Sequence, residues 1–131
     1  MKMIACAVVL LVGVTVLPAF AEQAFDGVKP LICATVQAVS CVPGEECERG
    51  LPESIGAPQF FRIDFTKKEI IGPKVTTQIR LMETSPEQIT LQGFELGMGW
   101  TIALDRETGK MTMTLSGREE GFIVFGACMT P

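Results

Sequence analysis

Residues 100–116 constrain the fold most, because they form two alternating runs of apolar and polar residues on either side of a turn. The apolar positions are Trp100, Ile102 and Leu104 in the first run, and Met111, Met113 and Leu115 in the second. Successive side chains of a β-strand point to opposite faces, so each run predicts a strand with one buried face. Between the runs, Asp105 can accept hydrogen bonds from the next backbone amides, and Gly109 can adopt a positive φ. The segment therefore predicts a β-hairpin.

Residues 1–21 differ in character from the rest of the chain. A lysine near the start precedes an apolar run over 4–17, and Pro18 ends this run before small residues that lead to Ala21. This order predicts a secretory signal peptide that is cleaved after Ala21. An uncleaved anchor is disfavoured, because the run is shorter than the roughly 20 residues that a membrane-spanning helix needs. We expect residues 22–131 to form one domain in a bacterial periplasm or outside the cell, without stable insertion into a membrane.

The charge and the missing residue types restrict the function. The chain has 15 acidic and 11 basic residues, a net charge of −4, which argues against nucleic acid and anionic membranes as partners. It contains no histidine, which excludes histidine bases, Ser-His and Cys-His pairs and imidazole metal sites. It also contains no asparagine, so it has no N-glycosylation site.

Four cysteines follow the predicted signal peptide, and an even number in an exported chain predicts two disulfides. Sequence alone allows three pairings. Cys41 and Cys47 flank a Pro-Gly turn, which favours a local bond between them. The pair Cys33 and Cys128 would then join the first predicted strand to the last, and would stabilise the fold by about 4–5 kcal/mol in the chain-entropy model. A zinc site is disfavoured, because the paired Cys-x-x-Cys spacing is missing.

Four of the stretches before residue 100 also predict strands. Residues 31–39 place Ala34, Val36 and Ala38 opposite Thr35 and Gln37, and residues 59–66 place Phe61, Ile63 and Phe65 on one face. In residues 75–83 the inward positions are Val75, Thr77, Ile79 and Leu81, and Met82 points outward. In residues 87–96 the inward positions are Ile89 and Leu91. Residues 40–58 are predicted to be a long irregular connection that is rich in proline, glycine and glutamate. Long loops in small domains are commonly functional or poorly ordered, so this is the candidate recognition loop. A solvated connection that a local disulfide holds in shape is the alternative, and it is slightly favoured.

Residues 122–127 are predicted to be the last strand, and they are apolar on both faces. A strand of this kind needs a cover over its outer side. We expect the extended segment at 22–30, with Phe25 as its anchor, to supply this cover in preference to a partner protein.

These elements predict an all-β fold without a helix of normal length after residue 21. Seven or eight short strands joined by consecutive hairpins favour an antiparallel meander that closes into a small, lipocalin-like barrel, with a β-sandwich as the alternative. An outer-membrane barrel is disfavoured, because the chain has no Tyr and one Trp, and several strands are too short.

Catalysis has little support in the sequence, and we predict no catalytic residue, no cofactor and no metal. Asp64 and Asp105 could act as a carboxylate pair of a hydrolase. Local roles explain both better, because Asp105 begins a turn and Asp64 lies on the outward face of its strand beside Arg62. Thioethers such as Met111 and Met113 can bind Cu(I), yet they share a face with core residues, so core packing is preferred.

Three motifs support a resemblance. They are Phe-Arg-Ile-Asp-Phe at 61–65, Trp-Thr-Ile-Ala-Leu-Asp-Arg-Glu-Thr-Gly at 100–109, and Phe-Gly-Ala-Cys at 125–128. With them the chain resembles a type of short exported proteobacterial protein of unassigned function. The resemblance covers most of residues 22–131 and implies a periplasmic β-barrel. It implies no activity.

The function predicted from these observations is non-catalytic binding by a monomer. One form is an inhibitor-like module that uses an acidic loop of Glu45, Glu46, Glu48 and Arg49 against a basic protein. The other is a carrier that holds a small apolar ligand in a barrel interior lined by Phe61, Phe65, Trp100 and Met113. The alternatives are a structural envelope protein without a ligand and, less favoured, a carboxylate-based hydrolase.

Overall fold

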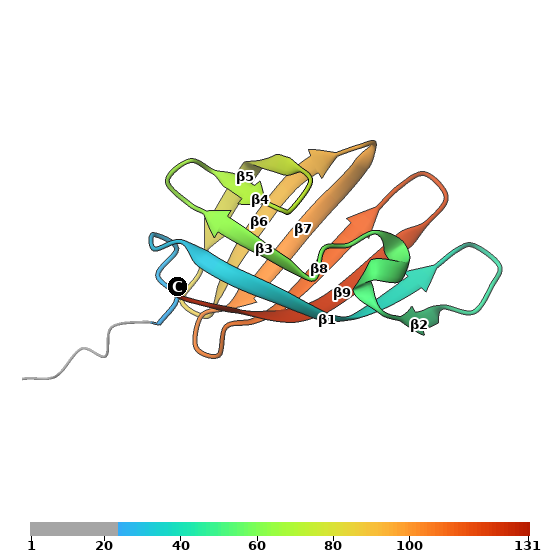
Figure 1. The fold of residues 1–131 in the computed structure, drawn as a ribbon, viewed down its shortest axis with the longest axis horizontal. Helices are drawn as coiled ribbons and strands as arrows, with labels where there is room; N and C mark the ends of the chain where they lie inside the picture. Colours follow the sequence, from blue (N-terminus) through green and yellow to red (C-terminus); the bar gives the residue numbers. More distant parts are fainter. Residues whose placement is uncertain (1–23) are drawn as a thin grey trace, which may run out of the picture.

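A computed structural model describes residues 24–131, which form an antiparallel β-barrel (Figure 1). The predicted signal peptide and its cleavage site lie outside the described residues. The elements in chain order are β1 (Leu31–Cys41), β2 (Glu48–Gly50), the 3₁₀ helix η1 (Pro52–Ile55), β3 (Phe60–Asp64), β4 (Glu69–Ile71), β5 (Thr76–Thr84), β6 (Gln88–Glu95), β7 (Met98–Asp105), β8 (Lys110–Ser116) and β9 (Gly121–Met129). No helix within this part of the chain is long and apolar enough to cross a membrane.

The barrel closes where the first strand meets the last. From β3 to β9 each strand pairs with the next one in the chain, and β1 pairs with both β3 and β9 (Figure 1). Eight strands therefore form the closed barrel, which confirms the predicted meander and excludes the sandwich. The ninth strand, β2, pairs only with the C-terminal half of β1. The prediction of an irregular connection over 40–58 is wrong in part, because this stretch contains β2 and η1.

The predicted hairpin consists of β7 and β8, and it has one buried face. Leu104 pairs with Met111 and Ile102 with Met113, and all four side chains lie in the core. In the turn, Asp105 Oδ1 accepts hydrogen bonds from the amides of Glu107 and Thr108 at 2.9 and 2.7 Å. The alternation and the turn chemistry were therefore sufficient to predict this hairpin.

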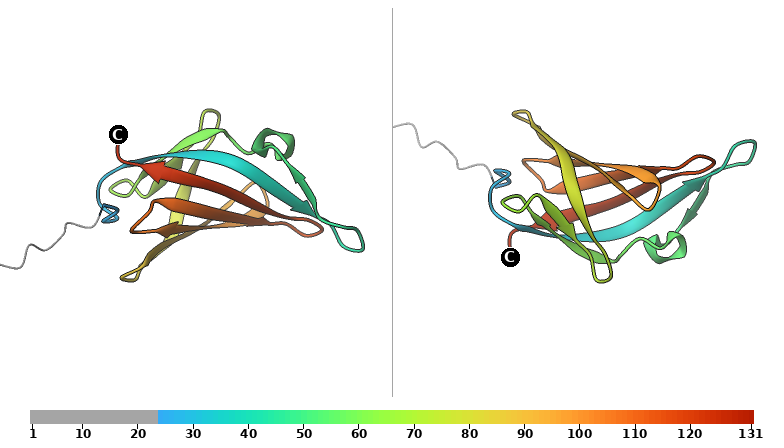
Figure 2. Two further views of the ribbon diagram at one scale, coloured as in Figure 1. Left: turned by 90° about the horizontal axis from the view of Figure 1, so that it is seen from below. Right: turned by 90° about the horizontal axis from the view of Figure 1, so that it is seen from above.

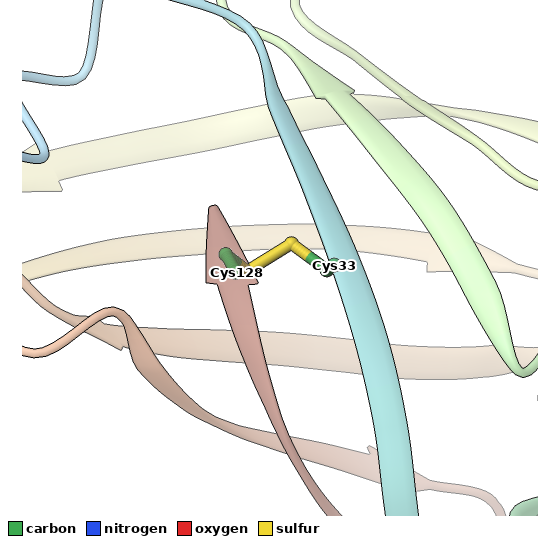
Figure 3. The surroundings of a disulfide bond; sticks show 2 residues. All are labelled: Cys33 and Cys128. Atoms are coloured by element: carbon green, nitrogen blue, oxygen red, sulfur yellow. A yellow bond between two sulfur atoms is a disulfide. The ribbon is translucent and has the colours of Figure 1, made fainter. Parts of the chain in front are cut away.

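Both predicted disulfides are present. Cys33 on β1 bonds to Cys128 on β9 inside the barrel, where the two residues face each other in the strand register (Figure 3). Cys41 bonds to Cys47 across the turn between β1 and β2. Disulfides of this kind indicate that the chain matures in an oxidising environment outside the cytoplasm.

A bulge in β1 contradicts the predicted faces of this strand. The register with β9 shifts between Thr35 and Gln37, so Val36 is left unpaired and is 67% exposed. On the N-terminal side of the bulge, the odd-numbered residues face inward, and Thr35 is buried with its hydroxyl donating to the Pro58 carbonyl at 2.8 Å. On the C-terminal side the even-numbered Ala38 is buried, so the inward face passes to the other set of residues. The extra residue exchanges the two faces, because side chains alternate with a period of two.

A second bulge changes β5 in the same way. Its register with β6 shifts between Ile79 and Leu81. Ile79 is buried as predicted, but Leu81 is 54% exposed and Met82 packs against the core. The predicted inward position of Leu81 and outward position of Met82 are therefore wrong.

The expectation that Phe25 covers the outer face of β9 is wrong. It packs against the core, and a Cβ atom on Gly109 would collide with its ring and would lie 2.6 Å from the Cys128 carbonyl oxygen. Arg106 Nε holds the segment by donating to the Phe25 carbonyl at 3.1 Å. Figure 2 shows the lead-in beside the C-terminus at one end of the molecule, while the turn before β2 projects at the other. Phe25 therefore fills one end of the barrel.

Candidate ligand-binding site

The opposite end of the barrel encloses an apolar cavity of about 290 Å³. Its lining combines strand residues with the chain that follows η1 and with the turns at this end: Ile55, Gly56, Ala57, Pro58, Phe61, Ile70, Gly72, Val75, Thr77, Glu95, Leu96, Met98, Trp100, Ile102, Met113, Leu115 and Phe122. Most of these side chains are aliphatic, aromatic or thioether groups. An apolar, preformed space of this kind is the usual form of a small-molecule site.

Three of the four residues that we predicted to line the barrel interior lie in this cavity. Phe61, Trp100 and Met113 are buried and line it from β3, β7 and β8. Phe65 is also buried in the core, but it does not line the cavity. The difference follows from strand direction, because β3 begins at the cavity end and Phe65 lies beyond its last residue.

Trp100 is held in place by a neighbouring glycine and by a hydroxyl group. Gly93 pairs with it across the β6–β7 ladder, and a Cβ atom on Gly93 would collide with the indole ring. The indole Nε1 donates to Thr77 Oγ1 at 3.3 Å, and this hydroxyl donates in turn to the Phe94 carbonyl at 3.4 Å. The glycine therefore lets the ring lie close to the sheet, and the tryptophan N–H and the threonine hydroxyl both have partners.

The cavity offers almost no polar chemistry. Glu95 is the one ionisable residue among its lining residues, and its side chain is half-buried at the end of β6. No buried side-chain nitrogen or oxygen among residues 24–131 lacks a hydrogen-bond partner. A molecule that entered this cavity would therefore meet almost only apolar surface.

A shallow groove of about 820 Å³ adjoins the cavity and shares Leu96 and Met98 with it. The rest of its lining comes from the turns that follow β1, β6 and β8, and comprises Val42, Pro43, Glu45, Gly97, Gly117, Arg118, Glu119 and Glu120. Of the predicted acidic loop, only Glu45 lines this groove. Glu46, Glu48 and Arg49 are exposed outside it. The four predicted residues are therefore all exposed, and one of them lines the groove.

Several lining residues were not predicted from the sequence. Leu96 and Gly97 form the two-residue turn between β6 and β7, with φ values of 48° and 79°. Ala57 and Pro58 reach the cavity because the chain after η1 lies over the barrel end. The Leu-Gly pair between two alternating stretches was a usable signal for a tight hairpin, whereas nothing local marks Ala57 as a lining residue.

The carboxylates considered for catalysis serve turns. Asp64 Oδ1 accepts from the Lys67 amide at 2.9 Å. Hydrogen bonds from Thr108, chiefly from its backbone amide and then from its side chain, lower the pKa of Asp105 below its usual range. Residues 24–131 contain no group of three or more Cys, Asp or Glu side chains that could hold a metal ion.

Comparisons of the chain with protein-family models, with curated proteins and with solved structures found no match. Its function is therefore inferred from the geometry and chemistry of the cavity.

Proposed function

We propose that the protein is an exported, non-catalytic binding protein that holds a small apolar ligand in the cavity beside Trp100. The observation that carries this proposal is the cavity itself, which is apolar, preformed and open at one end of a barrel whose other end is filled by Phe25. A hollow that is lined by apolar side chains and open to water is a common form of ligand-binding site, and a purely structural protein has no use for such exposed apolar surface.

The volume indicates a small ligand. Small-molecule pockets occupy about 300–1,000 Å³, so a cavity of about 290 Å³ lies at the lower limit. An apolar cavity of about 150 Å³ accommodates benzene. A ligand of roughly a dozen carbon atoms or fewer therefore suits the space.

The inhibitor-like alternative has weaker support. It uses the exposed acidic loop between β1 and β2 as a charged surface, and this loop contributes only Glu45 to the groove beside the cavity. The carrier form, in contrast, has three of its four predicted residues in one cavity. The proposed location is the periplasm or the extracellular space, supported by the two disulfides and by the composition of residues 1–21.

Intrinsic fluorescence provides the test, because Trp100 is the single tryptophan of a chain without tyrosine. Titration with 1-octanol, a neutral eight-carbon probe, is expected to change the Trp100 emission saturably. Ala57→Phe fills the cavity from the chain after η1 and is expected to weaken this binding at least about tenfold, since it removes the space that the ligand occupies.

Ala127→Phe is the matched control, because Ala127 is exposed on β9 and does not line the cavity. It should leave the titration unchanged. Equal weakening by both substitutions, or no saturable signal in the unmodified protein, would overturn the carrier function.

A further inference from the structure

We propose that the ligand carries no negative charge, with a head group such as an alcohol, aldehyde or ester in place of the carboxylate of a fatty acid. This inference rests on the proposed function, since it assigns a chemical class to the ligand of the same cavity. It follows from where charge lies around the cavity and from the state of the polar groups inside it.

The cavity wall contains no cation to receive an anionic head group. Among the residues that line it there is no lysine or arginine, and the one charged side chain is the carboxylate of Glu95. A carboxylate that loses water on entering a protein must be paired with a cation or with hydrogen-bond donors. An anionic ligand would have no such partner here, and it would also be repelled by Glu95.

The polar groups inside the cavity cannot replace that partner. The indole N–H of Trp100 already donates to the Thr77 hydroxyl, which already donates to the Phe94 carbonyl. A head group that competed for the indole N–H or the Thr77 hydroxyl would break these hydrogen bonds, and the new bonds would only replace the ones that were lost. The apolar part of the ligand therefore occupies the inner end, and its head group lies at the mouth beside Glu95.

The surface outside the mouth has the same sign of charge. The adjoining groove is lined by the carboxylates of Glu45, Glu119 and Glu120 and by one basic residue, Arg118. Because the groove and the cavity share Leu96 and Met98, a head group that protrudes from the mouth enters this acidic surrounding. Like charges at an interface disfavour binding, so the mouth discriminates against anions.

The experiment compares 1-octanol with octanoate, which share chain length and differ in charge, in Trp100 fluorescence titrations at pH 7.5 and low salt. Octanol is expected to bind at least about tenfold more tightly than octanoate. Glu95→Gln removes the charge at the mouth while keeping the size of the side chain, and is expected to reduce this preference several-fold. Glu83→Gln is the matched control, because Glu83 is exposed on β5 outside the cavity and the groove.

The outcomes separate this inference from the function on which it rests. If neither compound binds, the carrier function fails. If octanoate binds as tightly as octanol or more tightly, the cavity is a ligand site but the ligand class is wrong. If octanol is preferred and Glu95→Gln changes the preference no more than Glu83→Gln does, discrimination by the charge at the mouth is refuted.

Discussion

Leu96 occupies an unfavourable backbone conformation at the mouth of the cavity. Its φ is 48°, and together with Gly97 at 79° it forms a turn in which both central residues are left-handed. Such turns favour Asn-Gly, because a left-handed residue with a large side chain is strained. The Leu96 side chain is 86% exposed, so packing within residues 24–131 does not compensate for the strain. The same side chain lines both the cavity and the groove. We predict that it contacts the bound ligand.

The substitution Leu96→Asn tests this prediction through two effects of opposite sign. Asparagine tolerates the left-handed conformation, so the free energy of unfolding of the ligand-free protein should rise by about 1 kcal/mol. For a domain of this size the melting temperature should rise by about 4–8 °C. Covering part of a leucine side chain with a ligand is worth about 1 kcal/mol, so octanol should bind about fivefold more weakly.

The assays are thermal unfolding without ligand and the Trp100 fluorescence titration with octanol. Lys68→Asn is the matched control, because Lys68 also has a positive φ, of 56°, and does not line the cavity. It should stabilise the protein and leave binding unchanged. A stabilised Leu96→Asn protein with full affinity would refute the ligand contact, and a destabilised one would refute the assignment of strain.

Three further predictions concern stability. Replacing the Cys33–Cys128 pair by alanine should lower the free energy of unfolding by about 4–5 kcal/mol, and replacing the Cys41–Cys47 pair should lower it by about 2 kcal/mol. The losses differ because the first bond spans 95 residues and the second spans 6. Equal losses in denaturant titrations would contradict this prediction. Gly93→Ala should cost about 1–3 kcal/mol and shift the Trp100 emission, since its Cβ would also lie 2.6 Å from the Gln78 carbonyl oxygen; an unchanged spectrum would show that the ring is not displaced. Asp105→Ala should lower the stability of the protein at pH 7. The difference in stability between the two proteins should shrink as the pH falls below about 4, because a carboxylate with a lowered pKa stabilises the fold only while it is ionised. Unfolding midpoints measured across pH 2–7 test this, and a difference that does not change with pH would show that the turn contact is unimportant.

The sequence by itself determined the parts of this fold that depend on local chemistry. Period-two alternation predicted the hairpin of β7 and β8, because the side chains of a strand alternate between faces without reference to the rest of the chain. The Pro-Gly turn predicted the bond between Cys41 and Cys47, and only one partner then remained for Cys33. Consecutive hairpins predicted an up-and-down barrel, since sequential strands tend to pair.

Only the tertiary structure decided what the alternation leaves open. Val36 and Leu81 are outside the core because each lies at a bulge, and a bulge depends on the register of two strands, which neither strand specifies alone. Phe25 fills a barrel end that does not exist until β1 meets β9. The cavity is decided in the same way, because it is the volume that side chains from several strands and the chain after η1 fail to fill when they converge. No single stretch of sequence encodes such a difference of volumes, so the alternation predicted three inward-facing residues that line the cavity, Phe61, Trp100 and Met113, but not the cavity itself.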